Sequence, residues 1–305
     1  MNAAKRSASG EPVVFAPDID ADPAPSAVDD GSGADAPLLR DLRYAIEHGG
    51  LCVVYQPKFD MRTYDVVGVE ALVRWAHPRR GMLTPERFLP LVRRHGLMRS
   101  VTAEVFDLAL DDTARWYDNG VGVPVSINVF APAISDPELP TQISDALDRR
   151  GLPPEALVVE ITEDLLLDNM GKTRMVFKNL RDKGIRVAID DFGSGYSALW
   201  YLREFPVDEV KLDREFIAPM LTHPASAAIV RAVVDLAHAL GVTPVAEGVE
   251  NTETVTLLLE YGCEVAQGYL YSAPLSASAI QKLLEAQKRR RGATTLTAPA
   301  AARSS

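Results

Sequence analysis

The chain has 305 residues, of which 47% are hydrophobic and 24% are charged, a composition typical of a globular protein with enough apolar material for one large core. Its formal net charge of −10 argues against broad binding to nucleic-acid polymers or anionic membranes, although a small phosphate ligand is still allowed because a metal or local arginines can supply positive charge. Cys52 and Cys263 lie far apart in the sequence, which argues against a disulfide framework and favours the reducing cytoplasm.

Two segments of low complexity enclose the region that is expected to fold. Residues 1–37 are rich in Ala, Ser, Asp, Pro and Gly, which predicts a disordered leader, and residues 287–305 hold an arginine run and small residues, which predicts a disordered tail. Residues 38–286 are therefore the predicted domain. Neither flank has the apolar core of a signal peptide, and no apolar run approaches the ~20 residues of a membrane span, so we expect no membrane partner.

Helix and strand signals alternate along this domain. A helix is predicted at about 38–48, strands at 51–55 and 66–75, and a helix that begins at Pro85 behind its capping residue Thr84. Glycine suits the left-handed residue that ends a helix, and five later helices are expected to end at Gly120, Gly151, Gly184, Gly241 and Gly262. The later strand-like runs are 123–129, 157–162, 185–191, 210–212, 242–246 and 264–268.

This alternation predicts the α/β class. Helices and strands that recur at intervals of roughly 30 residues indicate parallel strands with helical crossovers. About eight such strands fit a closed TIM-like (β/α)8 barrel, and a doubly wound open sheet is the alternative. One crossover helix shows its predicted buried stripe plainly, at Ile229, Val233, Leu236 and Leu240.

Polar residues stand where these predicted strands end. In a βα barrel the carboxyl ends of the strands carry the chemistry, because they meet at one mouth. In chain order the polar residues at these ends are Glu70, Asn128, Glu160, Glu163, Asp190, Asp191, Lys211, Glu247, Glu250 and Gln267.

So many carboxylates in one barrel mouth need compensating charge. A single lysine cannot neutralise them, whereas two divalent cations could. Ligands that are all oxygen favour Mg²⁺ or Mn²⁺ over Zn²⁺, and the five histidines are expected in helices and loops. A paired-metal site of this kind is the usual apparatus for cleaving a phosphodiester.

Each of these residues also has a structural interpretation. Glu70 could be a surface residue on an edge strand, Lys211 could be a structural partner of Asp191, and Glu163 could be an acid favoured at a helix N-terminus. Their occurrence together, in register along the chain, favours the metal site.

These residues also carry a resemblance to a known family. From about Leu38 to Leu284 the chain resembles the EAL family of cyclic-di-GMP phosphodiesterases. The matching stretches are Tyr-Gln-Pro at 55–57, Glu-Ala-Leu-Val-Arg-Trp at 70–75, Ser-Ile-Asn at 126–128, Glu-Ile-Thr-Glu at 160–163, the run 190–197, Pro-Val-Asp at 206–208, Lys-Leu-Asp at 211–213, Ala-Glu-Gly-Val-Glu at 246–250 and Gln-Gly-Tyr at 267–269. The family's fold is a TIM-barrel variant whose first strand runs against the others.

The resemblance implies a role for each matching residue. One metal would be held by Glu70, Asn128, Glu160 and Asp190, and a second by Asp190 and Asp191. Glu247 would be a further ligand or a base that orients water, Lys211 would position the attacking water, and Glu163 would anchor the loop that begins at Phe192. Substrate would contact Gln56, Arg74 and Gln267, with Asp213 and Glu250 as weaker candidates.

The implied activity is hydrolysis of cyclic di-GMP to linear 5′-pGpG, with two Mg²⁺ or Mn²⁺ ions per active site. A homodimer is implied as well, and a regulatory protein partner is compatible with the sequence. The chain departs from the family's pattern at Arg94, Phe130, Ser194 and Tyr271, and none of these is a proposed ligand. The alternative functions are a cyclic-di-GMP receptor or adaptor without turnover and an unrelated metal hydrolase with a barrel fold.

Overall fold

A closed ring of strands forms the centre of the molecule. The computed structural model describes residues 35–134, 136–162, 170–193 and 202–297. Its strands are β1 (Leu51–Asp60), β2 (Val66–His77), β3 (Gly81–Leu83), β4 (Val125–Asn128), β5 (Leu157–Thr162), β6 (Arg186–Phe192), β7 (Glu209–Leu212), β8 (Thr243–Ala246) and β9 (Val265–Ala266).

The barrel closes through its first strand. The strands from β2 through β4 to β9 pair in parallel around the ring, and β3 is a short hairpin arm outside it. β1 is antiparallel to both of its neighbours: it pairs with β2 in a register that sets Gln56 opposite Glu70, and with β9 through Phe59 and Ala266. The closed eight-stranded barrel and its inverted first strand are therefore confirmed, and the open sheet is excluded.

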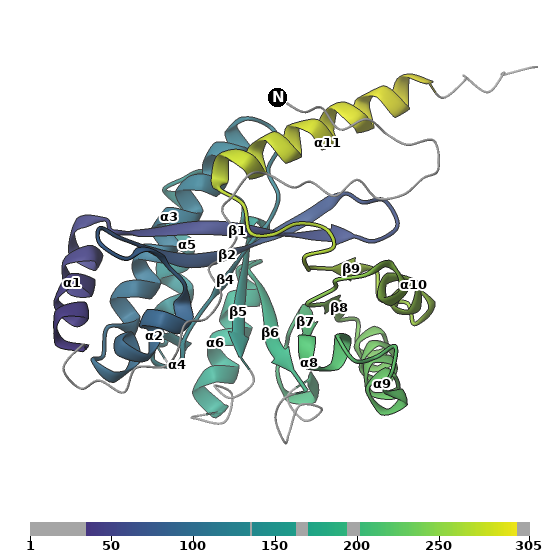
Figure 1. Cartoon of the computed structure of the whole chain (residues 1–305), viewed down its shortest axis with the longest axis horizontal. Coiled ribbons are helices and arrows are strands. Elements are labelled where there is room, and N and C mark those ends of the chain that lie inside the picture. Colours follow the sequence, from purple (N-terminus) through teal and green to yellow (C-terminus); the bar gives the residue numbers. More distant parts are fainter. Residues whose placement is uncertain (1–34, 135, 163–169, 194–201, 298–305) are drawn as a thin grey trace, which may run out of the picture.

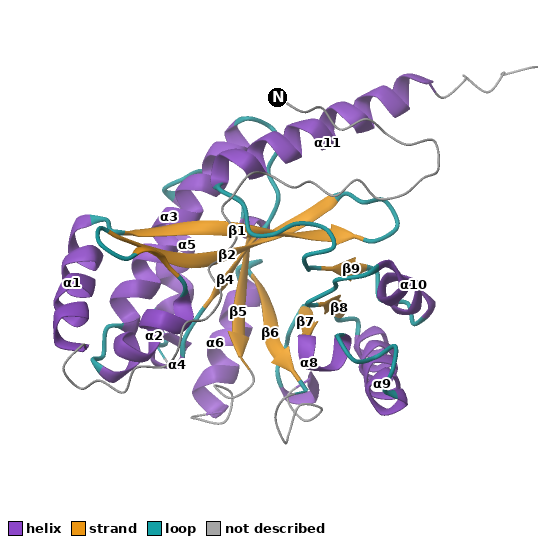
Figure 2. Ribbon diagram, in the orientation of Figure 1, coloured by secondary structure: helices purple, strands orange, loops and turns teal. Residues whose placement is uncertain are grey.

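Helices cover the outside of the strands (Figure 2). In the described residues they are α1 (Asp35–His48), α2 (Pro85–Arg94), α3 (Met98–Asp118), α4 (Ala131–Ile134), α5 (Leu139–Asp148), α6 (Met170–Asp182), α8 (Arg214–Ile217), α9 (Pro224–Leu240), α10 (Thr252–Glu260) and α11 (Ala277–Thr297), and a 3₁₀ turn lies at Pro154–Ala156. Each of the five glycines predicted to end a helix has a positive φ. None of the helices in the described ranges combines the length and apolar character needed to cross a membrane.

The last helix corrects the predicted tail. α11 lies along the outside of β1 and β2 (Figure 1), and it continues past the boundary expected at residue 287 as far as Thr297. The arginine run does not belong to a solvated tail, because Arg290 and Arg291 both pair with Asp65, which lies between β1 and β2. Gln287 adds a hydrogen bond, accepting at 2.6 Å from the backbone N–H of Val66.

One expectation is partly confirmed and one is wrong. Of the stripe predicted on α9, Val233 is buried and Leu236 packs against the core, whereas Ile229 and Leu240 are exposed. The buried face also holds Val230, Val234 and Ala237. His77 lies in β2 rather than in a helix or loop, and its buried ring lies 4.8 Å from that of Trp75.

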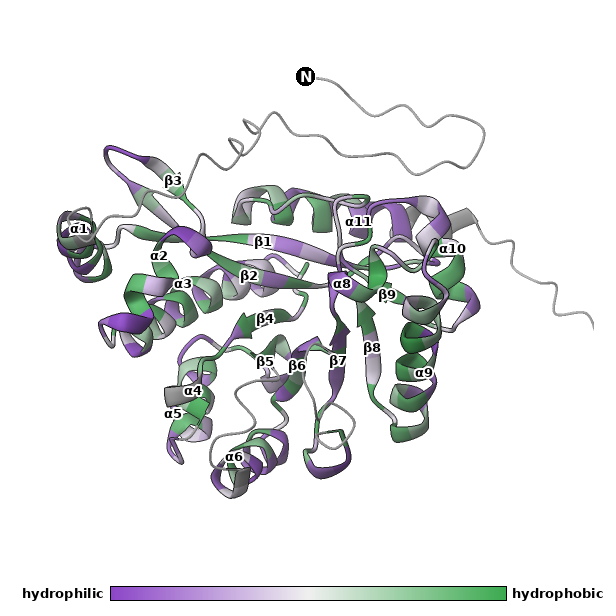
Figure 3. Ribbon diagram, turned by 60° about the horizontal axis from the view of Figure 1, so that its bottom comes forward, coloured by the Kyte–Doolittle hydropathy of each residue, from purple (hydrophilic) through white to green (hydrophobic). Residues whose placement is uncertain are grey.

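The barrel interior is less apolar than its wall. Strand residues that face outward form the hydrophobic core with the helices, whereas several residues that face inward are charged. Figure 3 shows the result on β7, where hydrophilic colour interrupts the strand. Glu209 and Lys211 alternate there with the apolar Val210 and Leu212, and all four residues are buried. We therefore expect the functional site among the charged residues inside the barrel.

Candidate active site

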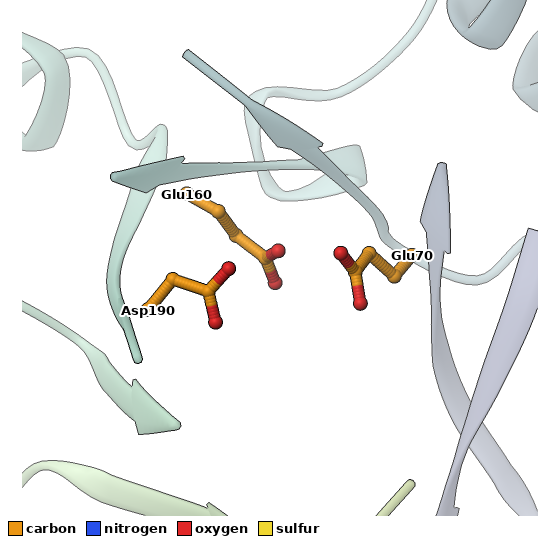
Figure 4. Close-up of side chains that lie close together, drawn as sticks. All are labelled: Glu70, Glu160 and Asp190. Carbon is orange, nitrogen blue, oxygen red and sulfur yellow. The ribbon is translucent and has the colours of Figure 1, made fainter. Parts of the chain in front are cut away.

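Three carboxylates converge at the carboxyl mouth of the barrel. Glu70 comes from β2, Glu160 from β5 and Asp190 from β6, and Figure 4 shows their side chains directed toward one another. All three are buried, and each offers an oxygen within 4.8 Å of an oxygen of the others. The predicted convergence of these distant acids therefore exists.

A break in the strand pattern brings a second group of acids together. Neighbouring residues of a regular strand point to opposite faces, yet Asp190, Asp191 and Glu247 also offer oxygens within 4.8 Å of one another. The register between β6 and β7 shifts between Ile189 and Phe192, and Asp191 has a φ of 53°. A bulge of this kind re-aims side chains, so both aspartates reach the mouth.

Lys211 stands at the centre of the acids. Its Nζ lies 2.7 Å from Glu247 Oε1, 2.8 Å from Asp190 Oδ1, 3.0 Å from Glu160 Oε2 and 3.3 Å from Glu70 Oε2. The lysine side chain is only 1% exposed. One ammonium group therefore serves as counter-ion to four carboxylates.

Burial and these charges shift the pKa values in opposite directions. Burial disfavours the ammonium, but the surrounding acids, first Asp190 and then Glu160, raise the pKa of Lys211 well above its usual value. Burial opposes ionisation of Glu160 as well, yet Lys211 and then Lys58 lower its pKa to about 2. Both groups are therefore charged at neutral pH.

The remaining acids lack enough positive charge. Burial raises the pKa of Glu247 to about 8, because the attraction of Lys211 offsets only part of the desolvation and of the repulsion from Asp190 and Glu70. Burial and the charge of Asp190 raise the pKa of Asp191 to about 6. Burial also raises the pKa of Glu70. Such a set of acids retains protons that a divalent cation would displace.

Amide side chains orient Glu70. The amide nitrogen of Asn128 donates to Glu70 Oε1 at 3.0 Å, and that of Gln267 donates to Glu70 Oε2 at 2.7 Å. Gln267 also donates to Gln56 at 3.0 Å. Within the described part of the chain, the buried Oε1 of Gln267 has no hydrogen-bond partner. A buried acceptor of this kind fits a site that takes up a cation, a water or a ligand.

The candidate ligand atoms are oxygens, which suit hard divalent cations. Glu70, Glu160, Asp190, Asp191 and Glu247 supply carboxylate oxygens, and Asn128 has a carbonyl oxygen besides the nitrogen that it donates. Mg²⁺ and Mn²⁺ prefer such oxygens. The structure thus brings together the five residues that were predicted as metal ligands, which are Glu70, Asn128, Glu160, Asp190 and Asp191.

A cavity of about 230 Å³ opens beside these acids. Its wall includes Gln56, Glu70, Asp190, Lys211, Arg214, Glu247, Gly248, Glu250, Gln267, Gly268 and Tyr269. Tyr269, one of these wall residues, is 60% exposed. Of the predicted substrate residues, Gln56, Gln267 and Glu250 therefore lie in the wall.

Two predicted substrate residues lie elsewhere. Arg74 lies further along β2, opposite Cys52, and its guanidinium donates to the carbonyl of Val73 at 2.9 Å. Asp213 is the N-cap of α8 and accepts from the backbone N–H of Glu215 at 2.7 Å. Neither is part of the cavity wall formed by the residues that the structure describes. Glu163 and Ser194 lie outside those residues.

Arg214 is a wall residue that the sequence argument missed. It follows Asp213 directly, and its guanidinium donates to Glu250 at 2.7 Å. Gly248 makes room for it: the residue has a φ of +65°, and a Cβ there would lie 2.4 Å from Cγ of Arg214. The signal available in the sequence was the glycine between Glu247 and Glu250.

Lys58 is the second missed residue. It is 3% exposed and its Nζ lies 2.8 Å from Glu160 Oε1 and 3.1 Å from Glu209 Oε2. Its spacing from Gln56 could have indicated that Lys58 faces the barrel interior, because residues two apart on a strand share a face.

Comparison with known proteins finds a family model and relatives that match this chain. A model of the EAL domain matches residues 39–274. The signaling protein YkoW of Bacillus subtilis is 35% identical over 243 residues, which are 80% of this chain and 30% of YkoW. The bifunctional diguanylate cyclase/cyclic di-GMP phosphodiesterase MucR of Pseudomonas aeruginosa is 37% identical over 241 residues, which are 79% of this chain and 35% of MucR. The chain thus spans less than two thirds of either relative.

A solved structure matches over almost its whole length. The MucR phosphodiesterase in complex with c-di-GMP superimposes with a TM-score of 0.76 at 37% sequence identity, covering 80% of this chain and 99% of that one. The barrel described above is thus the same architecture as a c-di-GMP-bound relative.

Proposed function

The chain belongs to the EAL domain family, and from this premise we propose that it hydrolyses cyclic di-GMP to linear 5′-pGpG with the help of two Mg²⁺ or Mn²⁺ ions. The observation that carries the proposal is the convergence of Glu70, Glu160 and Asp190 around Lys211 at the mouth of a closed barrel.

The grouping of the acids supports a proposed set of ligands for each ion. Glu70, Asn128, Glu160 and Asp190 would hold one ion, and Asp190 with Asp191 a second. When bound, the two ions supply the charge that activates a water and stabilises the oxygens of the phosphodiester.

The other residues of the mouth handle the proton and the phosphate. Glu247 lies 2.7 Å from Lys211 and close to Asp190 and Asp191, a position that suits a group that accepts a proton from the attacking water. Lys211 stays charged, orients the water and stabilises the negative charge that develops on the phosphate.

Substrate contacts come from the cavity wall. Arg214 is the guanidinium in that wall and would pair with a phosphate oxygen. The exposed ring of Tyr269 offers a stacking surface for a guanine base, and Gln56 can donate or accept at its edge. Arg74, four residues beyond Glu70 on β2, stays a proposed contact of a substrate phosphate.

A turnover assay tests the proposal directly. Purified protein is incubated with cyclic di-GMP in Mg²⁺, in Mn²⁺ and in chelator, and the product is separated by liquid chromatography. We expect pGpG with either metal and none with chelator. Glu70→Ala should abolish turnover because it removes a ligand, whereas Glu264→Gln, at an exposed pair with Arg62, should not. Ligand binding without turnover would identify a receptor instead, and preferential cleavage of other phosphodiesters would identify a different hydrolase.

The assembly and location of the protein are also proposals. We propose a homodimer in the cytoplasm, with a regulatory protein partner. Light scattering on the purified chain checks the dimer. Of the leader predicted at residues 1–37, residues 1–34 lie outside the described residues, and residues 35–37 belong to α1.

A further inference from the structure

Lys58 enters the barrel from the end opposite the active site. It lies on the inverted strand β1, opposite Gly68 of β2, and it lines a second cavity of about 150 Å³. The wall of that cavity consists of Lys58, Val67, Gly68, Pro124, Ser126, Val158, Arg186, Glu209, Thr243, Val245 and Val265. Most of these residues belong to the amino-terminal halves of the parallel strands. We call this cavity the barrel floor.

Hydrogen bonds fix the ammonium of Lys58 completely. Its Nζ donates to Ser126 Oγ at 2.8 Å, to Glu160 Oε1 at 2.8 Å and to Glu209 Oε2 at 3.1 Å. An ammonium group has three protons, so this geometry uses all of them. The lysine therefore has one defined position, although its side chain is long.

Glu160 is held between two lysines. Lys58 binds its Oε1 from the floor, and Lys211 binds its Oε2 at 3.0 Å from the mouth. Glu160 is completely buried, so water cannot replace either partner. Lys211 also pairs with Glu70, Asp190 and Glu247. Of these four candidate metal ligands, Lys58 pairs only with Glu160.

We infer that Lys58 is a positioning residue for the metal ligand Glu160: it holds Oε1 at the floor so that Oε2 is directed to the acid cluster, where a cation can bind it in competition with Lys211. This inference rests on the metal site of the proposed function. A ligand whose second oxygen is already bound loses less conformational freedom when a metal binds. Lys58 also supplies, from outside the metal shell, a positive charge that keeps a fully buried carboxylate ionised.

Metal affinity, rather than turnover alone, tests the inference. Mn²⁺ binding to the chelator-treated full chain is followed by electron paramagnetic resonance of the free ion. Lys58→Met keeps the length of the side chain and removes its charge and hydrogen bonds. We expect the dissociation constant for Mn²⁺ to rise about 10- to 100-fold, the usual effect of losing a group that orients a metal ligand.

Arg186→Met is the matched control. Arg186 is a cation of the same floor, but its contacts are Glu209 at 3.4 Å and the carbonyl of Glu155 at 3.1 Å. This variant should bind Mn²⁺ like the wild type. Equal weakening in both variants would show that any loss of floor charge has the same effect, and it would overturn the inference.

A second variant guards against a folding defect. Lys58→Met leaves Glu209 without one of its partners, so the double variant Lys58→Met/Glu209→Gln removes both members of that pair. It should keep the weak Mn²⁺ affinity, and Glu209→Gln alone should keep the strong one. Excess metal should restore most of the kcat of a Lys58 variant, which a merely structural defect would not allow.

The outcomes separate this inference from the proposed function. Wild-type Mn²⁺ affinity in a folded Lys58 variant overturns the positioning role and leaves the phosphodiesterase proposal standing. A wild-type chain that takes up no Mn²⁺ overturns both. Metal uptake without pGpG formation overturns only the proposed reaction, since the Lys58 comparison rests on metal binding.

Discussion

Replacing Lys211 by methionine should make the stability of the protein depend on metal. The Nζ of Lys211 lies between 2.7 and 3.3 Å from four carboxylates, and the side chain is buried. Removing one partner of a buried ion pair costs about 3–5 kcal/mol, because the other charge is left without compensation. In a domain of this size each kcal/mol lowers Tm by about 2–4 °C, so the metal-free variant should melt roughly 6–20 °C below the wild type.

The metal should return much of this loss. A ligand at 100 times its dissociation constant stabilises the folded state by about 2.7 kcal/mol. Because the lysine no longer competes for the carboxylates, Lys211→Met should gain more from Mg²⁺ than the wild type does, while its turnover stays low. Thermal and urea unfolding in chelator and in Mg²⁺, with both variants at the same pH, measure both effects.

Lys178→Met is the control for this prediction. Lys178 is an exposed residue of α6 that pairs with Asp182 at 2.6 Å, and such a surface pair is worth about 0–1 kcal/mol. If Lys211→Met in chelator were as stable as Lys178→Met, the role of Lys211 as the internal counter-ion of the site would be refuted.

Three further results are expected. Both stability and metal uptake should depend on pH, because the raised pKa values of Glu247 (about 8) and Asp191 (about 6) mean that the metal-free fold binds more protons than the unfolded chain. The stability of the metal-free protein should therefore fall as pH rises toward 8. Mn²⁺ affinity should increase from pH 6 to 8, and calorimetry should detect the release of protons on binding. An affinity independent of pH would contradict this. Tyr271→Phe should stabilise the protein or leave it unchanged in urea unfolding, because the buried hydroxyl has no hydrogen-bond partner in the described residues, whereas Tyr55→Phe should cost about 1 kcal/mol by removing the hydrogen bond to Asp112 at 2.5 Å. The reverse order would disprove the reasoning. Gly268→Ala should cost at least about 1–3 kcal/mol because its Cβ would lie 2.1 Å from the backbone oxygen of Val249, whereas Gly292→Ala, in open space on α11, should gain about 0.5–1 kcal/mol.

The local pattern predicted the parallel part of the barrel well. β5 matches its predicted bounds, and β6 is shifted by one residue, because apolar β-branched runs bounded by glycine are strong strand signals. The inverted direction of β1 could not come from that pattern, since strand polarity depends on which edges meet when the ring closes. It entered through the resemblance to the family. The hairpin arm at β3 was missed because three residues carry too little periodicity.

The acids of the site could be listed from the sequence, but their partners could not. Strand ends pointed to Glu70, Glu160 and Asp190 because parallel strands share one mouth. Lys58 was missed because the predicted strand stopped at residue 55, whereas β1 continues to Asp60 and carries the lysine into the barrel. The substrate contact that the motif around Glu70 suggests for Arg74 stays a prediction, because the residue lies four positions further along β2 and outside the described cavity wall.

The stripe of α9 shows a further limit. Ile229 and Leu240 have the spacing of a buried face, yet the face that packs consists of valines and an alanine one position away. Small side chains let the helix approach the strands closely, and that preference depends on the partner surface. A helix with apolar residues on several sides does not reveal from its own sequence which side is covered.

The position of Glu160 has a consequence for how the chain folds. This carboxylate on β5 needs one cation from β1 and another from β7, so its burial is favourable only after strands from both halves of the sequence have come together. A fragment that ends after β5 lacks Lys211, and a fragment that begins at β5 lacks Lys58. Neither half-barrel can enclose the charge in full, and the ring therefore assembles as one cooperative unit rather than by the docking of two stable halves.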